Sequence, residues 1–187
     1  MKKLLIVLKI FFGSYLAFSQ NTNYAKAELP LFKLENKEFT TVIDSIVSFS
    51  EKCEGSGLKF LNFTLGVREL EPNVYQIHLT LIDCQGLNFL LTSKNRNMAT
   101  GYFVHKNRTF IITGSLDLAE IFKPTDSKKM FESYSSKNLF NKDYSTWDYM
   151  YNAIDNKFKK TSFNPICVSE EDRIFPLCSD SMKIKKQ

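Results

Sequence analysis

The chain contains two histidines, His78 and His105, and histidine is the side chain that most often exchanges protons near neutral pH. His78 occupies a polar position in a predicted strand, and His105 stands beside a predicted turn, so both are expected at the surface of a sheet. Catalysis would need a carboxylate such as Asp83 or Asp117 within hydrogen-bond distance, and the sequence does not specify that geometry. His78 is therefore the single weak catalytic candidate, and no catalytic residue is assigned.

Other reactive groups are sparse. Residues 55–57 are Gly-Ser-Gly, which lacks the G-x-S-x-G spacing of a serine nucleophile turn. With seven glycines in the chain, no segment matches the glycine-rich loops that bind nucleotide phosphates. The basic residues are nearly all lysine, whereas nucleic-acid recognition favours the forked guanidinium of arginine. The sequence therefore predicts no cofactor and no nucleic-acid partner.

Tyrosines gather in the last third of the chain, at Tyr134, Tyr144 and Tyr149. Exposed tyrosine rings stack on sugars or anchor a protein partner, so these three are binding candidates together with His78. The neighbouring aromatic residues fall on the apolar stripe of a predicted helix and are expected in the core. An outward row of tyrosines would favour a carbohydrate ligand, whereas burial would make them structural.

The first residues have the layout of a cleavable export signal. Met1-Lys2-Lys3 are positively charged and precede an apolar stretch from Leu4 to Phe18. Cleavage after Ser19 is predicted, and it would leave 168 residues with a net charge of +2. The apolar stretch contains Lys9 and is shorter than the ~20 residues of a membrane-spanning helix. The sequence therefore predicts a secreted, periplasmic or envelope protein with no integral membrane segment after cleavage.

The remaining chain is long enough for one domain and short for two. The signal is assigned to residues 1–19 and an extended lead-in to residues 20–35. A single α+β domain is predicted for residues 36–180, and a basic, flexible tail for residues 181–187.

Four cysteines remain after cleavage, and an even number in an exported protein predicts disulfide bonds. Their spacing includes no close C-x-x-C pair, so a metal site is the minor alternative. Three pairings are possible. Cys53 precedes the first predicted strand and Cys84 follows the second, and antiparallel pairing would bring these ends together. This favours a Cys53–Cys84 bond, which leaves Cys167 to pair with Cys178.

Periodicity predicts the elements of the first half. After a cap at Asn36, apolar residues recur at helical spacing as far as Cys53. The period then changes from 3.6 to 2. The alternation of apolar residues, together with the turns between them, predicts five strands, at 61–67, 75–81, 87–92, 102–105 and 109–113.

Helical spacing predicts three helices in the second half, at 118–122, 126–134 and 145–160. The second face of the predicted sheet mixes apolar side chains with polar ones such as Gln76 and His78. Either the helix at 145–160 covers this face, or the face lines a pocket or a partner surface.

A helix followed by an antiparallel meander predicts an α+β fold in which the N-terminal helix packs across the sheet, with a C-terminal helical and irregular segment. Over residues 36–114 this outline resembles the cystatin-like and NTF2-like folds. Neither the inhibitory loop motif of cystatins nor the catalytic Asp/His pair of NTF2-like enzymes is present, and a fold does not determine a function.

The first hypothesis for function is a non-enzymatic exported binding protein of the inhibitor or immunity type, whose partner is a protein or a small ligand. It rests on the small number of catalytic groups. One alternative is a small-molecule-binding or hydrolytic enzyme that uses His78. The other is a carbohydrate-binding component of the cell envelope.

Overall fold

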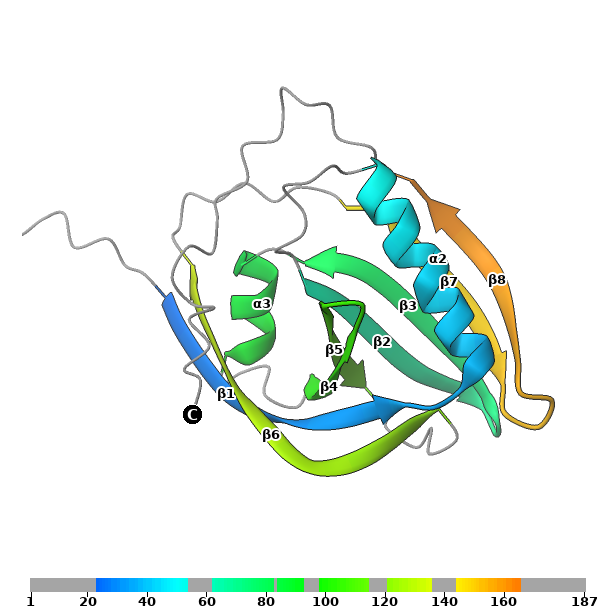
Figure 1. The fold of residues 1–187 in the computed structure, drawn as a ribbon, viewed down its shortest axis with the longest axis horizontal. Coiled ribbons are helices and arrows are strands. Elements are labelled where there is room, and N and C mark those ends of the chain that lie inside the picture. The colour runs from blue at the N-terminus through cyan, green and yellow to red at the C-terminus, as the bar shows by residue number, and fades with distance from the viewer. Residues whose placement is uncertain are drawn as a thin grey trace, which may run out of the picture.

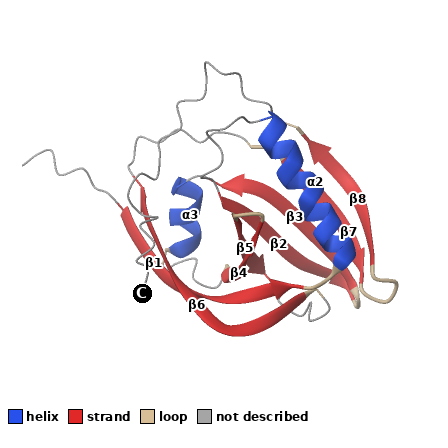
Figure 2. Ribbon diagram, viewed as in Figure 1, coloured by secondary structure: helices blue, strands red, loops and turns tan. Residues whose placement is uncertain are grey.

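The computed structural model of the protein describes residues 23–53, 62–82, 84–92, 98–114, 121–135 and 144–165. Within these residues, eight strands form one sheet and two helices pack against it (Figure 2). In chain order the elements are β1 (Asn23–Leu34), α2 (Lys37–Cys53), β2 (Asn62–Glu71), β3 (Val74–Ile82), α3 (Cys84–Leu91), β4 (Ala99–His105), β5 (Arg108–Gly114), β6 (Phe122–Ser135), β7 (Thr146–Asn152) and β8 (Lys157–Asn164). Their order across the sheet is β6-β1-β4-β5-β2-β3-β7-β8, so β6 and β8 are its two edges.

Helix α2 forms where the sequence predicts it. Asn36 caps its N-terminus, because the side-chain Oδ1 accepts a hydrogen bond of 2.9 Å from the backbone N–H of Phe39. The apolar stripe of α2 packs on one face of the sheet, which we call the inner face. The stripe residues are at most 2% exposed: Phe39, Ile43, Ile46 and Val47.

Aromatic rings fill the main core between α2 and the inner face. Phe110 lies between Phe63 and Phe103, with ring centroids 4.6 Å apart on each side. All three rings are fully buried. Toward the edge of the sheet, Tyr151 stacks on Phe158 with centroids 4.4 Å apart. The inner-facing residues of these strands therefore stabilise the fold through stacked and buried aromatic surface.

Helix α3 lies where the sequence predicts a strand at 87–92. Leu87, Leu90 and Leu91 are spaced at i, i+3 and i+4, so they share one helical face, and they are at most 8% exposed. Phe89, which lies between them in the sequence, is 56% exposed. The predicted strand is wrong because a short apolar run fits a buried helix as well as a buried strand.

A second, smaller core lies on the opposite side of the sheet, which we call the outer face. It joins α3 to Tyr102 and Ile111, at outer-facing positions of β4 and β5. The strands β1 and β6 form a long antiparallel ribbon that curves around α3 (Figure 1). This core covers one end of the outer face, whereas His78 on β3 remains exposed.

The sheet is mixed, which contradicts the predicted antiparallel meander. The hairpins β2–β3 and β4–β5 are antiparallel, as predicted. However, β5 lies parallel to β2, and β1 lies parallel to β4. The extended segment predicted as a lead-in forms β1, between β6 and β4. The outline of a helix on a meander, cystatin-like or NTF2-like, is therefore wrong, because local alternation predicts strands without specifying which strands pair.

Strands β7 and β8 replace the helix predicted at 145–160. Trp147, Tyr149 and Tyr151 are buried at every second position of β7, which is the period of a strand. The turn that follows places Asn156 in the left-handed region, at φ 49°, and returns the chain as β8. The prediction is wrong because some of these aromatic residues also match helical spacing, while aromatic side chains favour strands.

Strand β6 replaces the helix predicted at 126–134. It is an edge strand of 14 residues that pairs with β1. It begins at Phe122, which the sequence predicts as the last residue of a helix at 118–122. An edge strand tolerates Pro124, since its open side needs no hydrogen bond, and exposed lysines oppose the addition of a further strand.

Several predictions fall outside the described residues. These include the signal at 1–19, the tail at 181–187, and Cys167 and Cys178. Cys53 ends α2 and Cys84 begins α3, but their side chains are not described. The disulfide pairing therefore stays a prediction.

Candidate functional site

The outer face of β2, β3 and β7 carries the polar side chains of these strands. Ile77 is fully buried, whereas the side chain of the next residue, His78, is 47% exposed. The strand register places Gly66 opposite His78, and His78 opposite Asp148 on the next strand. The segment predicted to cover this face as a helix instead extends the sheet as β7 and β8.

A shallow, open depression of about 400 Å³ lies on this face, and we call it the Gly66 depression. Its floor lies at Gly66, because a glycine leaves empty the space that a side chain would fill. A methyl group at this position would lie 3.5 Å from Thr113 Oγ1 and 3.7 Å from the carbonyl oxygen of His78, which are ordinary contacts. The side chains around it come from three strands and from the turn residue before β4: Arg68, Gln76, His78, Thr113 and Met98.

A carboxylate holds His78 beside the depression. The Nδ1 atom of His78 lies 2.7 Å from Asp148 Oδ1, and the hydroxyl of Ser162 donates to Asp148 Oδ2 at 2.7 Å. Partial burial raises the pKa of Asp148, but the hydrogen bonds from Ser162 and His78 outweigh it and lower the pKa overall. Asp148 is therefore ionised at neutral pH and only accepts hydrogen bonds. It follows that Nδ1 carries the proton and that Nε2 is the acceptor of the neutral ring.

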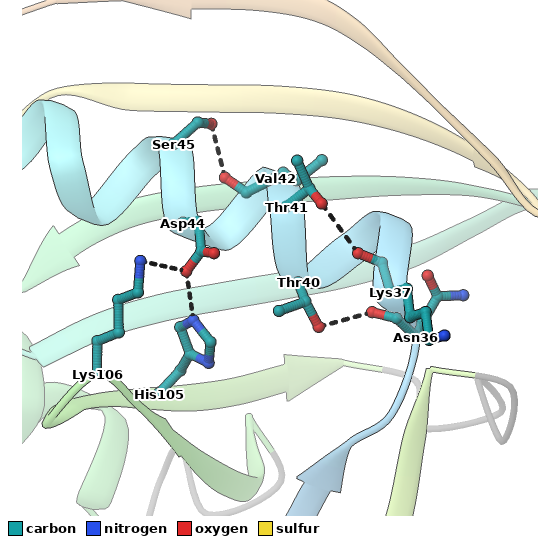
Figure 3. A network of polar contacts seen from close by, with 9 residues as sticks. All are labelled: Asn36, Lys37, Thr40, Thr41, Val42, Asp44, Ser45, His105 and Lys106. Atoms are coloured by element: carbon teal, nitrogen blue, oxygen red, sulfur yellow. Dashed lines mark hydrogen bonds and ion pairs between the residues drawn. The ribbon is translucent and has the colours of Figure 1, made fainter.

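His105 forms a second pair, with Asp44 of α2. Figure 3 shows Asp44 facing both His105, the last residue of β4, and Lys106, in the turn that follows. Asp44 Oδ1 lies 2.6 Å from His105 Nε2 and 2.8 Å from Lys106 Nζ. Hydrogen bonds from Lys106 and His105 hold the pKa of Asp44 below its ordinary value. This cluster connects the end of β4 and its turn to the helix over the main core, so it links two elements of the fold.

Asp148 and Ser162 are site residues that sequence reasoning missed. From the sequence, the expected carboxylate partner of a histidine is Asp83 or Asp117, and both lie outside the described residues. The segment with Asp148 and Ser162 was predicted to be helical over most of its length. The signal that identifies Asp148 is the alternation of aromatic and polar residues in β7, since it places Asp148 on the polar phase.

The three candidate tyrosines lie on different parts of the sheet. Tyr149 is buried on the inner face, and burial raises the pKa of its hydroxyl. Tyr144 is half-buried and packs against the main core. Tyr134 belongs to β6, at the edge of the sheet far from β7, and its side chain is not described. The structure therefore brings none of the three beside His78, and the Gly66 depression is lined by other residues.

The described residues contain no group of three or more His, Cys, Asp or Glu side chains placed to hold a metal ion. No described helix is both long and apolar enough to cross a membrane. In comparisons with protein-family models, curated proteins and solved structures, none matches the chain.

Proposed function

We propose that this protein is an exported binding protein without catalytic activity, and that its ligand or protein partner contacts the outer face at the Gly66 depression. The observation that carries the proposal is an open hollow with a glycine floor, bordered by four side chains that carry hydrogen-bonding groups: Arg68, Gln76, His78 and Thr113. All four belong to strands, so a ligand meets groups that the sheet holds in position. An enclosed cavity would instead favour a small, buried substrate.

The hydrogen bonds at His78 support binding rather than nucleophilic catalysis. In a catalytic triad, the serine hydroxyl contacts the histidine, and the carboxylate lies on the far side of the ring. Here Ser162 and His78 both donate to Asp148, so the carboxylate lies between them. Ser162 is therefore not next to the imidazole that would have to activate it.

Export is part of the same proposal. It rests on the signal-like residues 1–19 and on the even number of cysteines in the rest of the chain. Intact-mass analysis of the native protein tests it. We expect a chain that begins at Gln20 and has no thiol that reacts with an alkylating agent. A retained leader together with four reactive thiols would contradict export.

Gly66→Val tests the binding site. Valine fills the depression with a side chain that strands favour, and its β-carbon meets only ordinary contacts at this position. Thr64→Val is the matched control, because it places the same side chain on the same strand and face outside the depression. Both variants and the parent would capture partners from culture fluid and envelope extracts, with identification by mass spectrometry.

We expect the parent and Thr64→Val to retain one stoichiometric protein or ligand. Gly66→Val should retain about tenfold less, since a side chain in the hollow removes contacts worth more than 1 kcal/mol. Equal recovery by Gly66→Val would show that the partner binds elsewhere. No specific recovery by the parent would remove the proposal itself.

One observation favours a second function, and it is the contact between His78 and Asp148. A histidine whose Nδ1 donates to a carboxylate presents Nε2 as a general base. The second candidate is therefore a hydrolytic enzyme that acts on a small molecule in the Gly66 depression. A panel of ester, phosphoester and glycoside substrates distinguishes the two. An enzyme would lose about 100-fold or more of its turnover in His78→Gln, whereas a binding protein has no turnover to lose.

A further inference from the structure

We infer that the Gly66 depression binds an oxyanion, meaning a carboxylate, sulfate or phosphate group of a ligand, between Arg68 and His78. The inference rests on the proposed binding role of the depression and specifies its chemistry. The register pairs Arg68 with Gln76 and Gly66 with His78. Arg68 and His78 therefore lie diagonally across the hollow, at the separation of diagonal neighbours in a sheet, which is about 7 Å.

Arg68 supplies a cation that no described residue neutralises. Its side chain is exposed and forms no ion pair within the described part of the chain. Arg108, in contrast, is buried and lies 3.8 Å from the carboxylate of Glu51. The guanidinium of Arg68 presents a planar fork of N–H donors, which matches the oxygen spacing of a carboxylate or phosphate.

The other side of the hollow supplies further donors. Because Asp148 occupies Nδ1 of His78, the opposite ring nitrogen, Nε2, is the one left for a ligand, and it becomes a donor when the ring is protonated. The hydroxyl of Thr113 lies at the glycine floor, and Gln76 adds an amide. None of the described side chains that line the depression is acidic. The arrangement therefore matches an acceptor-rich group.

The charged groups nearest His78 on the outer face are Arg68 on β2 and Asp148 on β7. Asp148 is occupied by its hydrogen bonds with His78 and Ser162, and it does not line the hollow. An anion in the hollow therefore meets the guanidinium of Arg68 directly, and the two charges attract each other.

The surrounding outer face adds to this field. Lys157 and Lys159 stand opposite Asn152 and Met150, at outer-facing positions of β8, and neither forms an ion pair within the described residues. Glu71 opposes them from the end of β2, beside the β2–β3 turn. These two lysines and one glutamate carry a net positive charge. The resulting potential attracts anions toward the sheet.

Titration with simple oxyanions tests the inference. The mature, isotope-labelled chain would be titrated with sodium phosphate, sulfate or acetate at constant ionic strength, with chloride as the reference, while backbone amide shifts are recorded. We expect saturable shifts at Gln76, His78 and Thr113, with a dissociation constant in the millimolar range. The three probes show whether the site prefers a carboxylate or a tetrahedral anion.

Arg68→Gln and Lys159→Gln form a matched pair, because both remove one exposed positive charge from the outer face. Arg68→Gln should weaken binding about tenfold, the loss expected for a charge-assisted hydrogen bond, while Lys159→Gln should weaken it less than about twofold.

Absence of saturable shifts, or equal weakening by both variants, would overturn the inference. If capture of a partner still depends on Gly66 in that case, the proposed function stands without an oxyanion. If oxyanions bind but Gly66→Val captures as much partner as the parent does, the proposed function is wrong instead.

Discussion

The inner and outer faces of β2 and β3 differ in what surrounds one shared backbone. On the inner face, Phe63, Leu65 and Ile77 are fully buried under α2. On the outer face, one residue away in the chain, Gly66 and His78 border an open depression. Successive side chains of a strand point to opposite faces, so a single residue step separates the buried core from the open depression. Substitutions on the inner face should therefore change the free energy of unfolding, and substitutions on the outer face should change binding.

The two histidine–carboxylate pairs repeat this difference. Their contact distances are 2.7 Å for His78 with Asp148 and 2.6 Å for His105 with Asp44. The first pair joins neighbouring strands on the open face, whereas the second joins the end of β4 to α2. The contact distances are therefore nearly equal, but the first pair borders the open depression and the second connects elements that enclose the main core.

The largest expected effect comes from the inner face. Phe110→Ala removes a buried ring stacked between two others and should lower the free energy of unfolding by roughly 3–5 kcal/mol. Val104→Ala is the outer-face control, since Val104 is 53% exposed, and it should change that free energy by less than about 0.5 kcal/mol. Chemical denaturation measures both. Similar losses in the two variants would show that the faces do not differ in their contribution to stability.

Two glycines give the next contrast. Gly114 has φ 90°, and a methyl group there would overlap the carbonyl oxygen of Val67. Gly114→Ala should therefore cost about 1–3 kcal/mol of stability. Gly66→Ala meets ordinary contacts and should increase stability by up to about 1 kcal/mol, because alanine loses less backbone entropy on folding. Thermal unfolding of the two variants tests the contrast, and a destabilised Gly66→Ala would mean that the floor of the depression is already filled.

Local patterns were sufficient for the parts of the fold that local interactions determine. The cap at Asn36 and the apolar stripe after it predicted α2, and alternation with tight turns predicted the hairpins β2–β3 and β4–β5. Asn73 and Asn107 occupy positive φ in those turns, a conformation that asparagine adopts at low cost. The pairing of β5 with β2 and of β1 with β4 depends on contacts distant in sequence, which no local period encodes.

The candidate site was predictable in part. His78 was correctly placed on the polar phase of its strand, and the open second face was one of two stated alternatives. Its partner Asp148 lies 70 residues away and reaches it because β7 adds beside β3. The aromatic segment around Trp147 fitted both helical and strand periods, and its pairing with β3, distant in sequence, decides between them.

The smallest expected effect is on the acid dependence of stability, and it concerns the carboxylates of Asp44 and Asp148. The folded-state pKa of Asp44 is lowered by Lys106 and His105, so its ionised form stabilises the fold above its ordinary pKa of 3.8. This contribution is lost as the pH falls from that value through the lowered folded-state pKa. Asp44→Asn should therefore make the free energy of unfolding fall less steeply as the pH drops through and below 3.8, measured by denaturation at each pH.

Asp148→Asn should flatten the same acid range, because the pKa of Asp148 is also lowered. It should in addition change oxyanion binding, since an amide no longer fixes the proton on Nδ1 of His78. Asp44→Asn should leave oxyanion binding within about twofold of the parent, because Asp44 lies on α2, across the sheet from the depression. If both variants altered binding equally, the histidine pairs would share one role, and the separation of the two faces would be wrong.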